Sequence, residues 1–247
     1  MNSHFVSVAI GAAAGALIAA CYLCRRQSCA SVAARTVTRP IINKRACRVF
    51  VITGGPCSGK TSGMAILRRH FTQAGYKVLV VPEVATLLFN AGVELSWCNT
   101  PEKRIARQNA ILATMMHLEH VAAALSQMAD PSPAIVLCDR GAMDGSAYCS
   151  EQQWADVLGG LGVTNETLLD RYDAVVHLVT TADGAPDAYN NTTNGARYEG
   201  IEAAKVTDSK TQNAWRQHQH RFVVDNSTGF DEKMYRTFEY LHGLCTA

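Results

Sequence analysis

The chain alternates between short, continuous apolar segments and longer segments with helical periodicity. Five apolar segments of five or six residues, rich in β-branched side chains, are typical of buried strands; they are residues 48–53, 77–81, 134–138, 174–179 and 220–224. Apolar residues at a spacing of three or four predict helices at residues 62–74, 101–128, 152–158, 164–171, 201–216 and 231–244. This alternation predicts an α/β fold: a five-stranded parallel sheet with helices on both faces.

The first predicted strand leads directly into a glycine-rich loop at residues 54–61. Its spacing is that of a phosphate-binding loop, in which glycine, four residues and Gly-Lys-Ser/Thr follow one another. Such a loop curls its backbone N–H groups around an anion, and the following helix N-terminus adds partial positive charge. The residues predicted to bind the phosphates are Gly54, Gly55, Pro56, Cys57, Ser58, Gly59, Lys60, Thr61 and Ser62.

Two side chains of this loop have predicted roles in phosphoryl chemistry. Lys60 is expected to reach the β- and γ-phosphates of a nucleoside triphosphate, and the Thr61 hydroxyl is expected to ligate Mg²⁺. The loop does not distinguish bases, so ATP and GTP both remain possible ligands.

Polar side chains follow two other predicted strands, at the edge where a parallel sheet binds its ligand. Asp139 is expected to hold Mg²⁺ through water, unless it only caps a turn. Arg140 is a candidate clamp for a substrate anion or a partner for Asp144. Glu83 is a candidate general base for an acceptor hydroxyl or an acid at a helix N-terminus.

Further candidates lie outside these strand ends. Residues 181–200 are rich in Asn, Thr, Gly and Asp and predict a mobile loop, in which Arg197 is either a lid arginine or a solvated one. Arg104, Arg107 and Gln108 share a helix face that either reads an acceptor or is simply solvated. His177 lies inside an apolar strand and is predicted to be a core histidine.

The N-terminal third of the chain differs from the rest in charge. Residues 1–82 contain 11 Lys and Arg residues and no acidic one, whereas the remainder contains 12 basic and 21 acidic residues. Residues 5–24 carry no charge and are long enough for one bilayer crossing, and Arg25 and Arg26 follow them. The positive-inside rule then predicts a single-pass anchor with the folded domain in the cytosol. A mitochondrial presequence and a cleaved signal peptide are the alternatives.

Three regions therefore make up the predicted organisation. Residues 1–26 form a membrane anchor or targeting segment, residues 27–46 a basic linker that could bind anionic lipid, and residues 47–247 a P-loop NTPase domain. In the basic region at residues 1–82, aromatic residues do not alternate with the basic ones and no nucleic-acid-binding motif is present, so no nucleic-acid partner is expected. Nine scattered cysteines argue against a disulfide framework, and 48% hydrophobic residues argue against disorder.

Several stretches together resemble one known family. Residues 51–61, 81–86 and 138–141 look like the NadR-like AAA domain, which is shared by bacterial NTP-binding proteins and the eukaryotic TRPL translocation defect proteins. The resemblance extends over residues 47–245, and the further stretches that agree with it are residues 172–179, 182–185, 196–199 and 224–230, together with Lys233. It implies a five-stranded P-loop kinase-like fold that binds ATP or GTP with Mg²⁺.

The resemblance also implies site residues. Residues 54–62 match the family's phosphate site, Asp139 and Arg140 match its second acidic motif, and Arg197 matches its lid. Asn226 lies in a loop that is near the nucleotide base in similar kinases. Nicotinamide riboside kinase activity belongs to one relative in this family.

Two hypotheses about function follow. The first is phosphoryl transfer from Mg²⁺-bound ATP or GTP to a small hydroxyl acceptor, as in nucleoside kinases. Lys60 and Arg197 would stabilise charge, Thr61 and Asp139 would hold Mg²⁺, and Glu83 would be the base. The second is a nucleotide-dependent regulatory switch at a membrane, without kinase activity.

Overall fold

The computed structural model describes residues 47–128, 132–184 and 200–246. The predicted anchor and linker at residues 1–46, and the predicted lid residue Arg197, lie outside the described residues. Within those three ranges, no helix combines the length and the apolar character needed to cross a bilayer.

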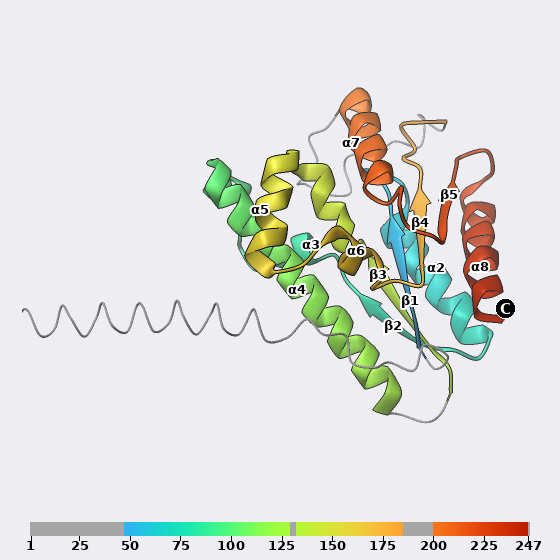
Figure 1. The fold of residues 1–247 in the computed structure, drawn as a ribbon. Helices are drawn as coiled ribbons and strands as arrows, with labels where there is room; N and C mark the ends of the chain where they lie inside the picture. The colour runs from blue at the N-terminus through green and yellow to red at the C-terminus, as the bar shows by residue number, and fades with distance from the viewer. Residues whose placement is uncertain (1–46, 129–131, 185–199, 247) are drawn as a thin grey trace, which may run out of the picture. The chain divides into compact units, whose positions relative to one another are not determined.

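A parallel sheet of five strands forms the centre of the domain (Figure 1), as the hydrophobic pattern predicts. The strand order is β2-β3-β1-β4-β5, so β1, which leads into the glycine-rich loop, is the middle strand. Each strand is parallel to its neighbours. The strands are β1 (Cys47–Thr53), β2 (Lys77–Val81), β3 (Ala134–Asp139), β4 (Ala174–Leu178) and β5 (Arg221–Val224).

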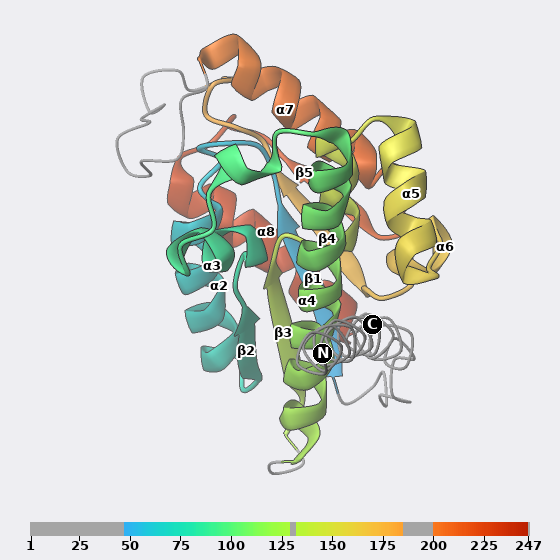
Figure 2. The ribbon, with the colours of Figure 1, turned by 90° about the vertical axis from the view of Figure 1, so that its left-hand side faces the viewer.

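Helices cover both faces of this sheet, as Figures 1 and 2 show. Helices α2 and α8 lie on one face, where Leu67, Phe71 and Met234 pack with alternate strand residues in one buried cluster. Helix α4 crosses the other face with α5 and α6 beside it, and α7 lies over the end of the sheet. The helices are α2 (Lys60–Gln73), α3 (Val84–Asn90), α4 (Pro101–Met128), α5 (Glu151–Leu161), α6 (Asn165–Leu169), α7 (Ile201–Ala214) and α8 (Phe230–Thr246).

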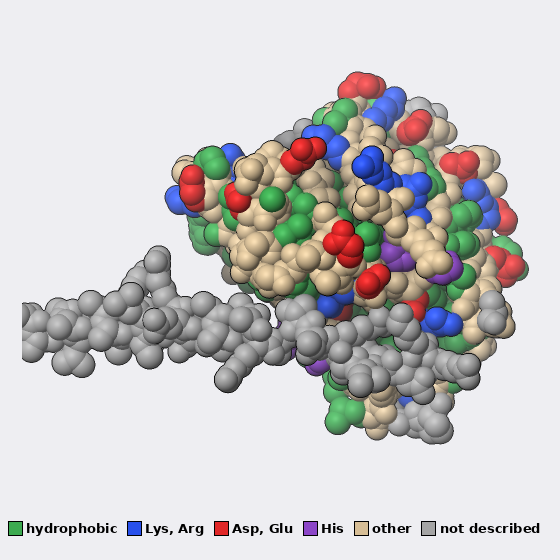
Figure 3. Space-filling model, viewed as in Figure 1, with side chains coloured by type: hydrophobic (Ala, Val, Ile, Leu, Met, Phe, Trp, Pro, Cys, Tyr) green, Lys and Arg blue, Asp and Glu red, His purple; other side chains and the backbone are tan. Residues whose placement is uncertain are grey.

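Three short elements were not predicted from the sequence: α3 and the 3₁₀ helices η1 (Leu95–Cys98) and η2 (Ala142–Tyr148). Each has seven residues or fewer, which is too short for a helical repeat to stand out. Helix α3 and η2 come soon after the ends of β2 and β3, and η1 follows α3, so all three shape the edge of the sheet at which a ligand is expected. The described part of the face in Figure 3 carries interspersed acidic and basic side chains.

Candidate functional site

The glycine-rich loop joins β1 to α2 and is held close to its neighbours. Gly54 and Gly59 have φ angles of 145° and 87°, which favour glycine. A β-carbon at Gly54 would collide with the Leu178 carbonyl, and one at Gly59 would lie 2.5 Å from the Phe230 ring. These two positions therefore need glycine both for their backbone angles and for space.

Lys60 lies at the first position of α2 and is 5% exposed. Its Nζ donates to the carbonyl oxygens of Gly54 and Gly55, at 2.9 and 2.7 Å, and to Ser58 Oγ at 3.1 Å. The next residue, Thr61, is exposed. The ammonium group thus lies inside the loop that the sequence predicts to surround phosphate, whereas Thr61 is open to solvent.

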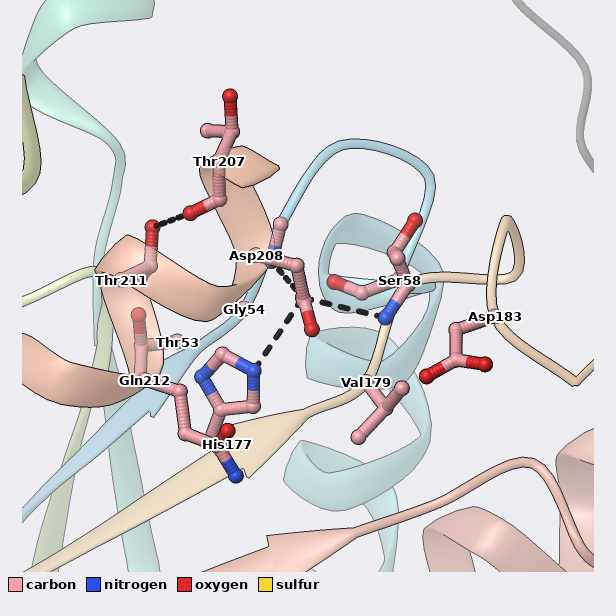
Figure 4. Close-up of polar contacts among 12 residues, drawn as sticks. Thr53, Gly54, Ser58, His177, Val179, Asp183, Thr207, Asp208, Thr211 and Gln212 are labelled. Atoms are coloured by element: carbon pink, nitrogen blue, oxygen red, sulfur yellow. Dashed lines mark hydrogen bonds and ion pairs between the residues drawn. The ribbon is translucent and has the colours of Figure 1, made fainter. Parts of the chain in front are cut away.

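Asp208 of α7 connects three parts of the chain beside this loop (Figure 4). Its Oδ1 accepts hydrogen bonds from the backbone N–H groups of Gly55, at 2.7 Å, and Thr180, at 3.2 Å. The same oxygen lies 3.2 Å from Nε2 of the fully buried His177. Burial alone would raise the pKa of Asp208. The His177 contact and the hydrogen bonds from the two N–H groups outweigh this effect, so the pKa lies below its usual value.

Lys233 of α8 supports the loop from the opposite side. Its Nζ donates to the Val179 carbonyl at 2.8 Å, to Asn226 Oδ1 at 2.7 Å and to the Ser58 carbonyl at 3.5 Å. Asn226 in turn donates to the carbonyl oxygens of Thr180 and Asp183. The side chain of Asn226 is therefore occupied by contacts within the protein, and its predicted place near a nucleotide base remains a prediction.

Glu83 and Arg140 form an ion pair at the carboxyl ends of β2 and β3. Arg140 Nε lies 2.5 Å from Glu83 Oε1, and Thr86 Oγ1 donates to Glu83 Oε2 at 2.6 Å. Burial would raise the pKa of Glu83, but Arg140 and Thr86 lower it to about 2. Arg140 also donates to the Gly54 carbonyl at 3.3 Å, which brings the pair to the glycine-rich loop.

Arg140 has a left-handed backbone, with φ at 70°, which is uncommon for a residue with a long side chain. Burial alone would lower its pKa, whereas Tyr148 and Glu83 raise the pKa above its usual value. The guanidinium is therefore charged and fixed in place. Its carboxylate partner is Glu83 rather than Asp144.

Asp139 is the last residue of β3, and one of its carboxylate oxygens is free to bind a metal ion or its water. Its Oδ1 is buried and has no hydrogen-bond partner among the residues that the structure describes. Burial raises the pKa of Asp139, and the nearby Lys60 partly offsets that rise. A buried carboxylate oxygen with an open acceptor position suits Mg²⁺ or its bound water. Three-residue clusters of His, Cys, Asp or Glu are absent from the described ranges.

A cavity of about 580 Å³ opens beside the loop and the Glu83–Arg140 pair. Its wall is formed by α3, η1, η2 and one face of α4, and it is mainly apolar apart from a few charged and amide groups. The lining residues are Pro56, Glu83, Val84, Ala85, Thr86, Phe89, Asn90, Leu95, Arg107, Gln108, Ile111, Met115, Arg140, Asp144, Gly145, Tyr148 and Thr207.

The structure thus brings together Lys60, Glu83, Asp139 and Arg140, which the sequence predicts as site residues. Sequence reasoning missed Asp208, named Lys233 only as part of the family resemblance, and considered Asp144 only as a partner for Arg140. The Asp144 carboxylate accepts from Thr53 Oγ1, from Gly141 N at 2.7 Å and from Trp215 Nε1 at 3.2 Å. These partners lie far from Asp144 in sequence or depend on turn geometry, so residue spacing could not reveal them.

The fold and the loop define the class of protein: a P-loop NTPase with a kinase-like arrangement of strands. Residues 49–233 match the family described as AAA domain, and the chain belongs to that family. Among solved structures, it is similar to deoxyadenosine kinase from M. mycoides with bound dATP. That likeness has a TM-score of 0.53 at 12% identity, covers 79% of this chain and 99% of the kinase, and shows a shared fold. No curated protein matches by sequence.

Proposed function

We propose that this protein transfers the γ-phosphoryl group of Mg²⁺-bound ATP or GTP to a hydroxyl group of a small acceptor. The observation that carries the proposal is the cavity, because its lining includes both Pro56 of the glycine-rich loop and the Glu83–Arg140 pair. A triphosphate in the loop would present its γ-phosphate to this cavity. The kinase-like fold supports the same reaction class.

The chain's own residues would divide the work as follows. Lys60 would leave the carbonyl oxygens of its own loop and donate to the β- and γ-phosphates. Thr61 and Asp139 would hold Mg²⁺, which supplies neutralisation of phosphate charge when it is bound. Arg197 would add positive charge from the segment before α7, as the family resemblance implies.

Glu83 would accept the proton of the acceptor hydroxyl as its oxygen attacks the γ-phosphorus and the nucleoside diphosphate leaves. With a pKa of about 2, its carboxylate is ionised at neutral pH but is a weak base while it is paired with Arg140. Proton transfer therefore belongs late in the reaction, when the acceptor oxygen has lost most of its electron density to phosphorus.

The proposal also covers the group within the AAA domain family to which the chain belongs and the cellular location of the protein. The stretches that resemble NadR-like and TRPL translocation defect proteins support a place in that group, with Asn226 near the base. Residues 5–24 would anchor the protein with its domain in the cytosol, and a mitochondrial presequence is the alternative. Protease protection and carbonate extraction of cell membranes distinguish these two.

The test follows loss of γ-phosphate from ATP and GTP with Mg²⁺, alone and with a panel of nucleosides. Lys60→Ala should lower the transfer rate by about 100-fold or more, because it removes a donor to the developing charge. Glu83→Gln should lower turnover by about 100-fold or more and leave nucleotide affinity within about twofold.

Lys60-dependent transfer to one acceptor would establish the enzyme. Tight Lys60-dependent binding with no transfer would instead support the regulatory alternative, a nucleotide switch that uses its basic linker at an anionic membrane. In that case binding to anionic vesicles should depend on the bound nucleotide and be insensitive to Glu83→Gln.

A further inference from the structure

Two neighbouring polar residues of α4 line the cavity without using their hydrogen-bonding groups. Gln108 is 6% exposed, and its side-chain amide has no hydrogen bond within the part of the chain that the structure describes. Nε of the adjacent Arg107 is buried and likewise has no partner among the described residues. Buried polar groups in native proteins are nearly always hydrogen-bonded, so the buried Arg107 Nε, next to an amide that also has no described hydrogen bond, indicates a ligand in the cavity.

The other charged groups of the cavity wall are already satisfied. Glu83 and Arg140 pair with each other at 2.5 Å, and the Asp144 carboxylate accepts hydrogen bonds from Gly141 N and Trp215 Nε1. Arg107 forms no ion pair with a described carboxylate. The wall therefore contains a guanidinium whose charge and donors are available to a bound molecule.

We propose that Arg107 and Gln108 bind an oxyanion of the acceptor, such as a carboxylate, and thereby determine which acceptors are used. This inference rests on the proposed function, because it names the substrate class for the same cavity. The planar guanidinium of arginine matches the two oxygens of a carboxylate, and the Gln108 amide can donate alongside it. Much of the remaining wall is apolar, which strengthens such a charge-assisted hydrogen bond.

The same geometry selects against cationic acceptors. A pyridinium ring, as in nicotinamide riboside, would bring a positive charge into a cavity that already contains Arg107, which pairs with no carboxylate of the described ranges. An acceptor that carries a carboxylate would offset that charge. The cavity thus favours acidic over neutral acceptors, and neutral over cationic ones.

The experiment compares acceptors that differ by one carboxylate. Orotidine is compared with uridine, and nicotinic acid riboside with nicotinamide riboside. Binding to the full-length chain is measured by calorimetry with a non-hydrolysable triphosphate present, and phosphoryl transfer is measured separately. The variants are Arg107→Met, which removes the charge, and Arg107→Lys, which keeps the charge but loses the planar fork.

Arg104→Met is the matched control. Arg104 is one turn earlier on α4, is not part of the cavity wall, and donates to the Asn99 carbonyl at 3.3 Å. Its removal deletes the same charge from the same helix but should leave acceptor preference unchanged. Equal melting temperatures of the two methionine variants would show that lost stability does not explain a difference between them.

We expect the wild-type chain to bind the acidic member of each pair about tenfold or more tightly than its partner. Arg107→Met should abolish this preference, and Arg107→Lys should retain part of it. Equal binding within both pairs, no binding of either acidic probe, or a preference that survives Arg107→Met would overturn the proposal. An Arg107-dependent preference without any phosphoryl transfer would support the oxyanion site and contradict the kinase function.

Discussion

The carboxylate of Asp208 accepts a hydrogen bond from the backbone N–H of Gly55 at 2.7 Å, although the two residues are 153 positions apart in sequence. Helix α7 is thereby fastened to the second residue of the glycine-rich loop. The carbonyl of Gly55 accepts from Lys60, so the same peptide segment connects α7 to the lysine that is expected to meet phosphate. The position of α7 and the shape of the loop are therefore coupled.

Asp208→Ala should weaken triphosphate binding by about tenfold or more, because it leaves the N–H groups of Gly55 and Thr180 buried without an acceptor. Asp208→Asn keeps one acceptor oxygen and should show a smaller loss. Titration with a fluorescent triphosphate analogue measures both. Asp231→Ala, at an exposed site on α8, should leave the dissociation constant unchanged. Unchanged affinity in Asp208→Ala would show that α7 does not position the loop.

Gly141→Ala should destabilise the fold by about 1–3 kcal/mol. A β-carbon there would lie 2.7 Å from Val51 Cγ2 and 2.8 Å from the Trp215 ring, both of which are buried. Gly159→Ala on α5 has nothing within 4 Å of the new atom and should stabilise the chain by about 0.5–1 kcal/mol, because alanine favours a helix. Urea unfolding of both variants checks the opposite signs; equal shifts would contradict the close packing at Gly141.

The buried Lys233 should make stability depend on alkaline pH. Burial lowers its pKa from 10.5 to about 8 in the folded chain, so the unfolded chain holds this proton over a higher pH range. Stability should therefore rise, relative to Lys233→Met, as pH increases from 8 to 10.5, by up to about 3 kcal/mol.

Urea unfolding at a series of pH values measures this difference. Lys205→Met is the control, since the side chain of Lys205 is 42% exposed and pairs with Glu202 on the surface. If wild type and Lys233→Met have parallel stability curves over this range, then Lys233 is protonated equally in the folded and unfolded states.

The sheet could be predicted from the sequence because its strands are short and apolar, and the three inner strands β1, β3 and β4 are buried along almost their whole length. The bounds of β2 agree with the pattern to the residue, and β3 differs only by including Asp139. The phosphate loop could also be predicted, because Gly59, Lys60 and Thr61 are adjacent in sequence and their spacing carries the chemistry.

Contacts between distant segments could not be predicted in this way. Asp208 is one polar residue in a helix that contains several, and only the folded chain places it against Gly55 and His177. The same limit applies to Gln108, whose place on the cavity wall depends on how α4 packs against η2. A sequence pattern predicts one helix or strand at a time, whereas the roles of these side chains depend on contacts between different helices, strands and loops.

The central place of β1 has a consequence for synthesis of the chain. Its neighbours are β3 and β4, so one side of β1 stays open until residues 134–139 have been made. The other side, where Phe50 is paired with Ala174, stays open until about residue 178 has been made. At about 5–20 residues per second, the ribosome needs roughly 6–25 s for that stretch. A nascent chain that ends before β4 should therefore bind no triphosphate and should need a chaperone to shield the apolar β1 strand, although its phosphate loop is already complete in sequence.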